Sequence, residues 1–115
     1  VRIQLALGEA QARLEAIKVM NWRMAWAVER NELDPAQASA VKVSSTESLI
    51  EVYRLMLEVI GPAGGLRPGS EAAVLGGAIG QEMRACQINT FGGGVNEVQR
   101  EIVAMAGLRM PRAPR

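Results

Sequence analysis

The sequence has no histidine and a single cysteine, Cys86, so it lacks most of the side chains that bind transition metals. A structural zinc site needs four Cys, His or carboxylate ligands, and one cysteine cannot close a disulfide within the chain. We therefore expect neither a metal site nor an intramolecular disulfide. A lone cysteine fits a reducing compartment, and we expect a cytoplasmic protein.

Aromatic residues are also scarce, with one Phe, one Tyr and two Trp, and the formal net charge is only +1. Single-stranded nucleic acids are bound by stacking aromatics in basic grooves, so the sequence argues against a nucleic-acid partner despite Arg109, Arg112 and Arg115 near its end. The longest apolar run, residues 72–80, is far shorter than the ~20 residues that span a membrane. No membrane-spanning segment is predicted.

What the sequence has is aliphatic residues at helical spacing. Hydrophobic residues make up 49% of the chain, and the first thirty residues carry an apolar stripe at alternating spacings of three and four, which predicts a long amphipathic helix. Trp22 and Trp26 lie on a neighbouring face, and we expect them to pack against another helix or a second subunit. The stripe consists of Leu7, Ala10, Leu14, Ile17, Met24 and Val28, with Asn21 in its one polar position.

A second long helix is predicted from Pro35 to about Ile60, because Asp34 can cap it and proline suits the first helical position. Its apolar positions are Val43, Leu49, Ile50, Tyr53, Met56, Leu57 and Ile60. Lys42 is the exception in this helix, and the pattern favours a solvated or snorkelling lysine over a ligand-binding one.

The glycine- and proline-rich residues 61–70 predict a loop, after which Ser70 resembles the cap of a third helix that Gly76 and Gly77 weaken. A fourth helix is predicted from Asn96 to about Ala106, ending at Gly107. No strand-like alternation is found, so the sequence predicts an all-α, antiparallel up-and-down four-helix bundle forming one domain over residues 1–115.

The run Gly92-Gly93-Gly94 directly precedes this fourth helix. Glycines accept positive φ and let a ligand approach the backbone, and a helix start presents free N–H groups. On local grounds alone, however, three glycines also fit a simple flexible turn between two helices.

The residues around this loop resemble the C-terminal part of the acyl-CoA dehydrogenase family. Arg84 and Gly94 keep the spacing of that family without a gap, and Asn96-Glu97-Val98-Gln99-Arg100 is similar to its N-E-I-Q-R motif. The resemblance extends upstream, less tightly, through residues 38–42 and 57–61. It implies a C-terminal helical domain, so we expect a longer, three-domain chain.

The resemblance also implies an FAD-dependent enzyme that dehydrogenates an acyl-CoA thioester between Cα and Cβ. It places Gly94 near the substrate and Val95, Asn96 and Glu97 along the flavin. It further implies that the segment containing Glu58, Ile60 and Gly61 meets the ADP portion of the FAD of a neighbouring subunit, in a homo- or hetero-oligomeric dimer or tetramer.

Several positions depart from the family pattern. Gly93 occupies the place of the catalytic glutamate of straight-chain members, so this chain lacks that base and we predict no catalytic residue within it. Val95 replaces a threonine, Ala85 an aspartate, Glu58 a glutamine and Pro62 a glycine. The alternative to the enzyme is a small non-enzymatic helical interaction or assembly module.

Overall fold

The computed structural model describes residues 1–112 and 114, and these residues form helices, turns and loops without a strand. The helices are α1 (Arg2–Glu29), α2 (Pro35–Ile60), α3 (Ala78–Ala85) and α4 (Asn96–Ile102). A π-helical segment, Val103–Gly107, continues α4. The predicted all-α helical bundle is confirmed.

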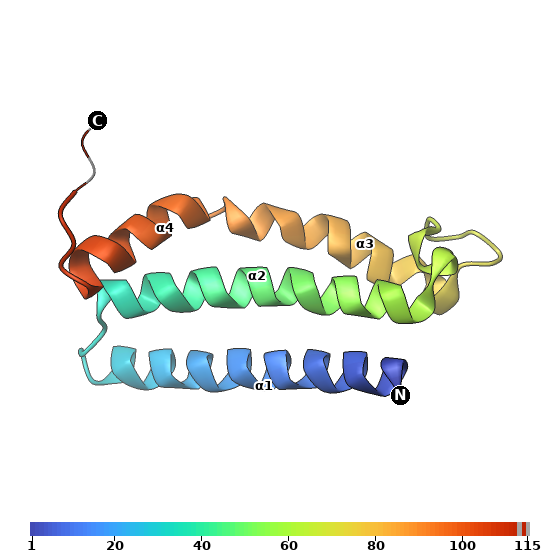
Figure 1. Cartoon of the computed structure of the whole chain (residues 1–115), viewed down its shortest axis with the longest axis horizontal. Helices are drawn as coiled ribbons and strands as arrows, with labels where there is room; N and C mark the ends of the chain where they lie inside the picture. Colours follow the sequence, from blue (N-terminus) through green and yellow to red (C-terminus); the bar gives the residue numbers. More distant parts are fainter. Residues whose placement is uncertain (113, 115) are drawn as a thin grey trace.

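The helices are arranged in three antiparallel layers (Figure 1). α1 and α2 form a long hairpin, and α3 and α4 run end to end along the other side of α2. The third side of the bundle is therefore built from two short helices in series, and the glycine loop between them lies over the N-terminal third of α2, at Lys42.

The start of α2 follows the predicted capping rule. The Asp34 carboxylate accepts a hydrogen bond from the Ala36 N–H at 2.9 Å, and Pro35 occupies the first turn. Gly61, with φ +76°, ends the helix, a conformation that costs glycine little. Both predicted boundaries of α2 are confirmed.

The third helix begins later than the sequence indicated. Ser70 lies in a turn, and α3 starts only at Ala78, after Gly77 with φ +78°. A Cβ on Gly77 would lie 2.8 Å from the Pro68 nitrogen, so the loop backbone packs directly on this glycine. The glycine pair that weakened the predicted helix in fact marks its beginning.

The core is small for a chain of this length. It centres on Ala10 of α1 with Val52 and Leu55 of α2, whereas Leu7, Leu14 and Val28 of the predicted α1 stripe are 48%, 40% and 56% exposed. The radius of gyration is 17.3 Å, against about 13 Å for a compact domain of this size. The accessible surface of 7993 Å² exceeds that of a typical monomer of the same mass by about 1,900 Å².

None of the helices in the described part of the chain is long and apolar enough to cross a membrane.

Candidate functional site

The candidate site is the loop of residues 90–96, which joins the end of a 3-10 segment, Cys86–Thr90, to α4. Gly93 and Gly94 have φ values of +68° and +105°, a region that L side chains rarely adopt. A Cβ on Gly94 would also collide with the Gln99 side-chain amide. Two of the three glycines are therefore required by the backbone, so the run is more than a flexible turn.

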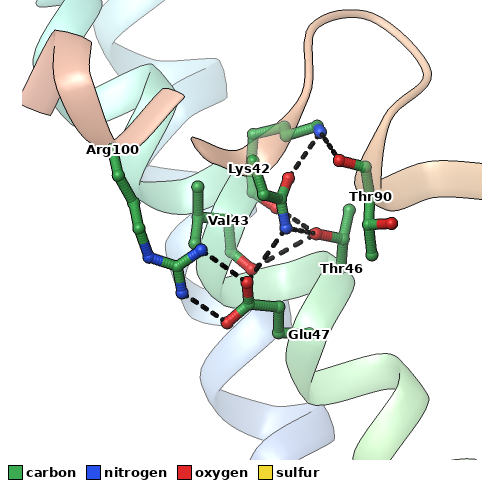
Figure 2. Close-up of polar contacts among 7 residues, drawn as sticks. Lys42, Val43, Thr46, Glu47, Thr90 and Arg100 are labelled. Carbon is green, nitrogen blue, oxygen red and sulfur yellow. Dashed lines mark hydrogen bonds and ion pairs between the residues drawn. The ribbon is translucent and has the colours of Figure 1, made fainter. Parts of the chain in front are cut away.

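Lys42 holds this loop against α2. Its Nζ donates to the Gly94 carbonyl at 2.7 Å, to the Thr90 carbonyl at 3.3 Å and to Asn96 Oδ1 at 2.6 Å. Figure 2 shows the side chain extending from α2 toward Thr90. Three acceptors use all three N–H groups of an ammonium. Lys42 is thus an internal donor and not the solvated or snorkelling residue that the sequence favoured.

Asn96 is the most deeply buried polar residue of the site, at 2% exposure. Its Nδ2 donates to Thr46 Oγ1 at 3.0 Å and to Glu47 Oε1 at 3.2 Å, while its Oδ1 accepts from Lys42. Burial of an amide is favourable only when its donors and acceptor are satisfied, and here both ends are. The Asn96 side chain fixes the start of α4 to α2.

Glu47 and Arg100 form a bidentate ion pair at the edge of this network (Figure 2). Arg100 Nη1 donates to Glu47 Oε1 at 2.8 Å, and Arg100 Nη2 donates to Glu47 Oε2 at 2.7 Å. The hydrogen bonds from Arg100, helped by the one from Asn96, hold the pKa of Glu47 below its ordinary value, and partial burial opposes this effect only in part. Glu47 is therefore ionised at neutral pH and engaged, which makes it a poor proton acceptor. Arg100 is therefore engaged in an ion pair within the chain.

The family described as "Acyl-CoA dehydrogenase, C-terminal domain" matches residues 2–108. This chain belongs to the acyl-CoA dehydrogenase family. The resemblance carried by the glycine loop and the motif after it is confirmed.

Two curated members of the family come from Mycobacterium tuberculosis. The acyl-CoA dehydrogenase FadE26 is 46% identical over 98% of this chain, and the acyl-CoA dehydrogenase FadE29 is 40% identical over 98%. The chain spans 29% and 28% of the length of these relatives. It thus corresponds to less than a third of either protein.

Solved structures agree with the fold. The ChsE4–ChsE5 complex from Mycobacterium tuberculosis matches with a TM-score of 0.89 and 46% identity, over 97% of this chain and 29% of that one. The Tcur3481–Tcur3483 steroid ACAD matches with a TM-score of 0.92 and 48% identity, over 96% of this chain and 29% of that one. The first of these structures is a complex of two differently named proteins, and the second carries two protein names.

The residues expected near the flavin and the substrate differ in their exposure. Val95 is 41% exposed and Glu97 is exposed, while Asn96 is turned toward α2. Gly93 borders open space, because no atom lies within 4 Å of where its Cβ would be. The exposed side of the loop is therefore formed by the glycine backbone, Phe91 and Val95, with Glu97 just after it.

Glu58, Ile60 and Gly61 lie at the far end of α2. Sixteen residues of α-helix separate Glu58 from Lys42, a rise of about 24 Å at 1.5 Å per residue. Glu58 is exposed and pairs with Arg54. The predicted cofactor residues thus form two groups, one near each end of α2.

Sequence reasoning missed the contribution of α2 to the site. Thr46 and Glu47 both accept hydrogen bonds from Asn96, which lies 50 and 49 residues further along the chain. A signal was present in Lys42, a long cationic side chain next to the buried Val43. Trp22 and Trp26 remain 65% and 57% exposed, with Lys18 over the Trp22 ring and Arg30 over the Trp26 ring.

No group of three or more His, Cys, Asp or Glu side chains that could hold a metal ion is present in the described residues.

Proposed function

We propose that this chain is the C-terminal helical domain of a longer FAD-dependent acyl-CoA dehydrogenase, which converts an acyl-CoA thioester to its trans-2-enoyl product. The observation that carries the proposal is the family match over residues 2–108, combined with a glycine loop that is held rigidly on α2. The chain spans 29% of the length of FadE26, so other segments would supply the rest of the site.

The residues present are compatible with a flavin beside the loop. The space around Gly93 is open, and the exposed Val95 offers an apolar surface for a planar ring. When bound, FAD would accept the hydride that leaves the substrate Cβ. In this proposal Gly94 lets the thioester end of the substrate approach the backbone, Val95 and Glu97 line the flavin, and Asn96 acts from behind by fixing the loop.

Proton removal from the substrate Cα needs a base that this loop does not supply. Gly93 has no side chain, and Glu47 is held ionised by Arg100. We propose that the carboxylate that takes the proton comes from another segment of the longer protein or from a partner subunit.

A second group of contacts is proposed at the other end of α2. Glu58, Ile60 and Gly61 would meet the ADP portion of FAD bound by a neighbouring subunit. Their separation from the loop by about 24 Å of helix supports two different FAD molecules or two distant parts of one.

An oligomer is proposed because the isolated chain exposes more surface than a monomer of its mass. The exposed apolar residues include Trp22, Trp26 and Leu14, and large apolar patches typically mark contacts with other domains or subunits. The similar ChsE4–ChsE5 structure is a complex, and the Tcur3481–Tcur3483 structure carries two protein names, which supports assembly with a related partner.

The likeness to a steroid ACAD at 48% identity also favours one substrate class. We propose an acyl-CoA whose acyl group carries a bulky ring system. Gly93 supports this choice, because the absence of a side chain there leaves room beside the thioester end.

The test is a dehydrogenation assay with the complete protein, alone and with candidate partner subunits, and with FAD and an artificial electron acceptor. The substrates are straight-chain, branched and steroid-bearing acyl-CoA esters. FAD-dependent formation of a 2-enoyl thioester, highest for the ring-bearing ester, supports the proposal. A protein that binds no FAD in any assembly contradicts it and favours the interaction or assembly module instead.

A further inference from the structure

Among the described residues, Lys42 is the α2 side chain that hydrogen-bonds to the backbone of the loop of residues 90–96. In the described residues, the hydrogen bonds that join the loop backbone to α2 are those from Lys42 Nζ to the carbonyls of Thr90 and Gly94. The other backbone bonds of this segment are local, such as Gly92 N–H to the Ile88 carbonyl at 2.7 Å. Lys42 therefore hydrogen-bonds to the loop backbone near both of its ends, at Thr90 and at Gly94.

The hydrogen bond from Lys42 to the Gly94 carbonyl also determines the orientation of the Gly94–Val95 peptide. The Gly94–Val95 peptide is trans, and in a planar trans peptide the N–H points opposite to the carbonyl. Because the Gly94 carbonyl points inward to Lys42 at 2.7 Å, the Val95 N–H points away from α2. The same contact stabilises the positive φ of Gly94, because glycine in an unbonded loop would sample negative φ values about as readily.

We propose that Lys42 is the positioning residue of the 90–96 loop, and that its ammonium group keeps the Val95 N–H turned outward as a hydrogen-bond donor on the cofactor side. This inference rests on the proposed function for the identity of the ligand, FAD. The clamp itself rests only on contacts within the chain.

The chemistry of lysine suits this role better than that of arginine. A tetrahedral ammonium can direct three N–H groups to three converging oxygens, here two carbonyls and one amide oxygen. A guanidinium is planar and longer, so it cannot meet the same three acceptors. Without any donor, three oxygens would face one another and the loop would turn away from α2.

The first measurement is hydrogen–deuterium exchange of the backbone amides of residues 91–97 in the complete assembled protein. In Lys42→Met these amides should exchange at least about tenfold faster, since charge-assisted hydrogen bonds are lost from both ends of the loop. Amides of α1 should keep their rates. Lys18→Met is the matched control, because Lys18 is the other lysine of the chain and its side chain is exposed on α1; it should leave the loop unchanged.

The second measurement is the dissociation constant for FAD, with flavin fluorescence as the readout. Lys42→Met should weaken FAD binding about tenfold or more, Lys42→Arg should lie between Met and wild type, and Lys18→Met should match wild type. Loop exchange that stays at the wild-type rate in Lys42→Met overturns the clamp. Faster loop exchange with unchanged FAD affinity overturns the role in cofactor positioning.

A loss of fold is recognised separately. If Lys42→Met also raises exchange throughout α1, then Lys42→Arg decides: faster exchange confined to the loop supports the clamp, and wild-type rates overturn it. If the wild-type protein binds no FAD at all, the proposed function fails while the exchange comparison still tests the clamp.

Discussion

Replacement of Asn96 by Ala would remove the central polar side chain of the network. Asn96 is 2% exposed and joins Lys42, Thr46 and Glu47. The alanine variant loses one hydrogen bond to a neutral hydroxyl and two to charged groups. It also leaves a small cavity at the start of α4.

The expected cost follows from these partners. A neutral hydrogen bond contributes about 1 kcal/mol and one to a charged group about 1.5–3 kcal/mol. The sum is an upper bound, because Lys42 keeps two carbonyl acceptors and the half-exposed Glu47 keeps Arg100 and water. We expect the free energy of unfolding to fall by about 2–3 kcal/mol, which corresponds to a melting temperature lower by about 10 °C for a domain of this size.

The assay is urea unfolding of the 115-residue chain, followed by far-ultraviolet circular dichroism, for wild type, Asn96→Ala and Asn89→Ala. Asn89 is exposed in the 3-10 segment before the loop, so its variant should remain within about 0.5 kcal/mol of wild type. An Asn96→Ala variant as stable as Asn89→Ala would refute the reasoning, since the buried network would then contribute nothing to folding.

Three further outcomes are expected. In sedimentation velocity the isolated chain should self-associate, and replacing both Trp22 and Trp26 by Ala should weaken this association; a monomer at high micromolar concentration for the wild type would contradict it. Gly93→Ala in the complete enzyme should strain the loop, because φ is +68°, yet should not cause the ~10²–10⁴-fold loss in rate that follows removal of an acid–base group; a loss of that size would mean that the loop is aligned wrongly. The pKa of Glu47 is lowered in the folded chain, so its pair with Arg100 stabilises the fold at pH values above the unfolded pKa of Glu47, and this contribution is lost as the pH falls through the lower folded pKa. In unfolding measurements between neutral pH and about pH 3, a Glu47→Gln variant should therefore show a weaker dependence of stability on pH than wild type. An unchanged pH profile would contradict the pairing.

The sequence predicted those parts of the fold that depend on local rules. Asp34 and Pro35 determine where α2 begins, and the apolar spacing in residues 1–30 determines α1. The predicted start of α3 was wrong, because the helix begins where Gly77 contacts the backbone of a loop about ten residues earlier in the chain. Local propensity at Ser70 carries no information about that contact.

The sequence predicted the residues of the glycine loop and α4 that form the candidate site, but not the residues of α2 that hold them. The glycine loop and the motif beginning at Asn96 were visible in the sequence, but the direction of the Asn96 side chain was not. That direction depends on Lys42 and Glu47, about fifty residues earlier, and a single sequence does not show which distant polar residues meet. That Gly93 occupies the position of the family's catalytic glutamate stays a prediction.

The anchoring of the loop from α2 has a consequence for how such enzymes can diversify. The residues that fix the loop, Lys42 and Asn96, are different from Gly93, where an added Cβ would have no atom within 4 Å beyond its chain neighbours. The only local obstacle is its positive φ. A substitution at residue 93 would therefore leave the contacts that hold the loop on α2 in place, so this position can change in sequence while its support stays the same.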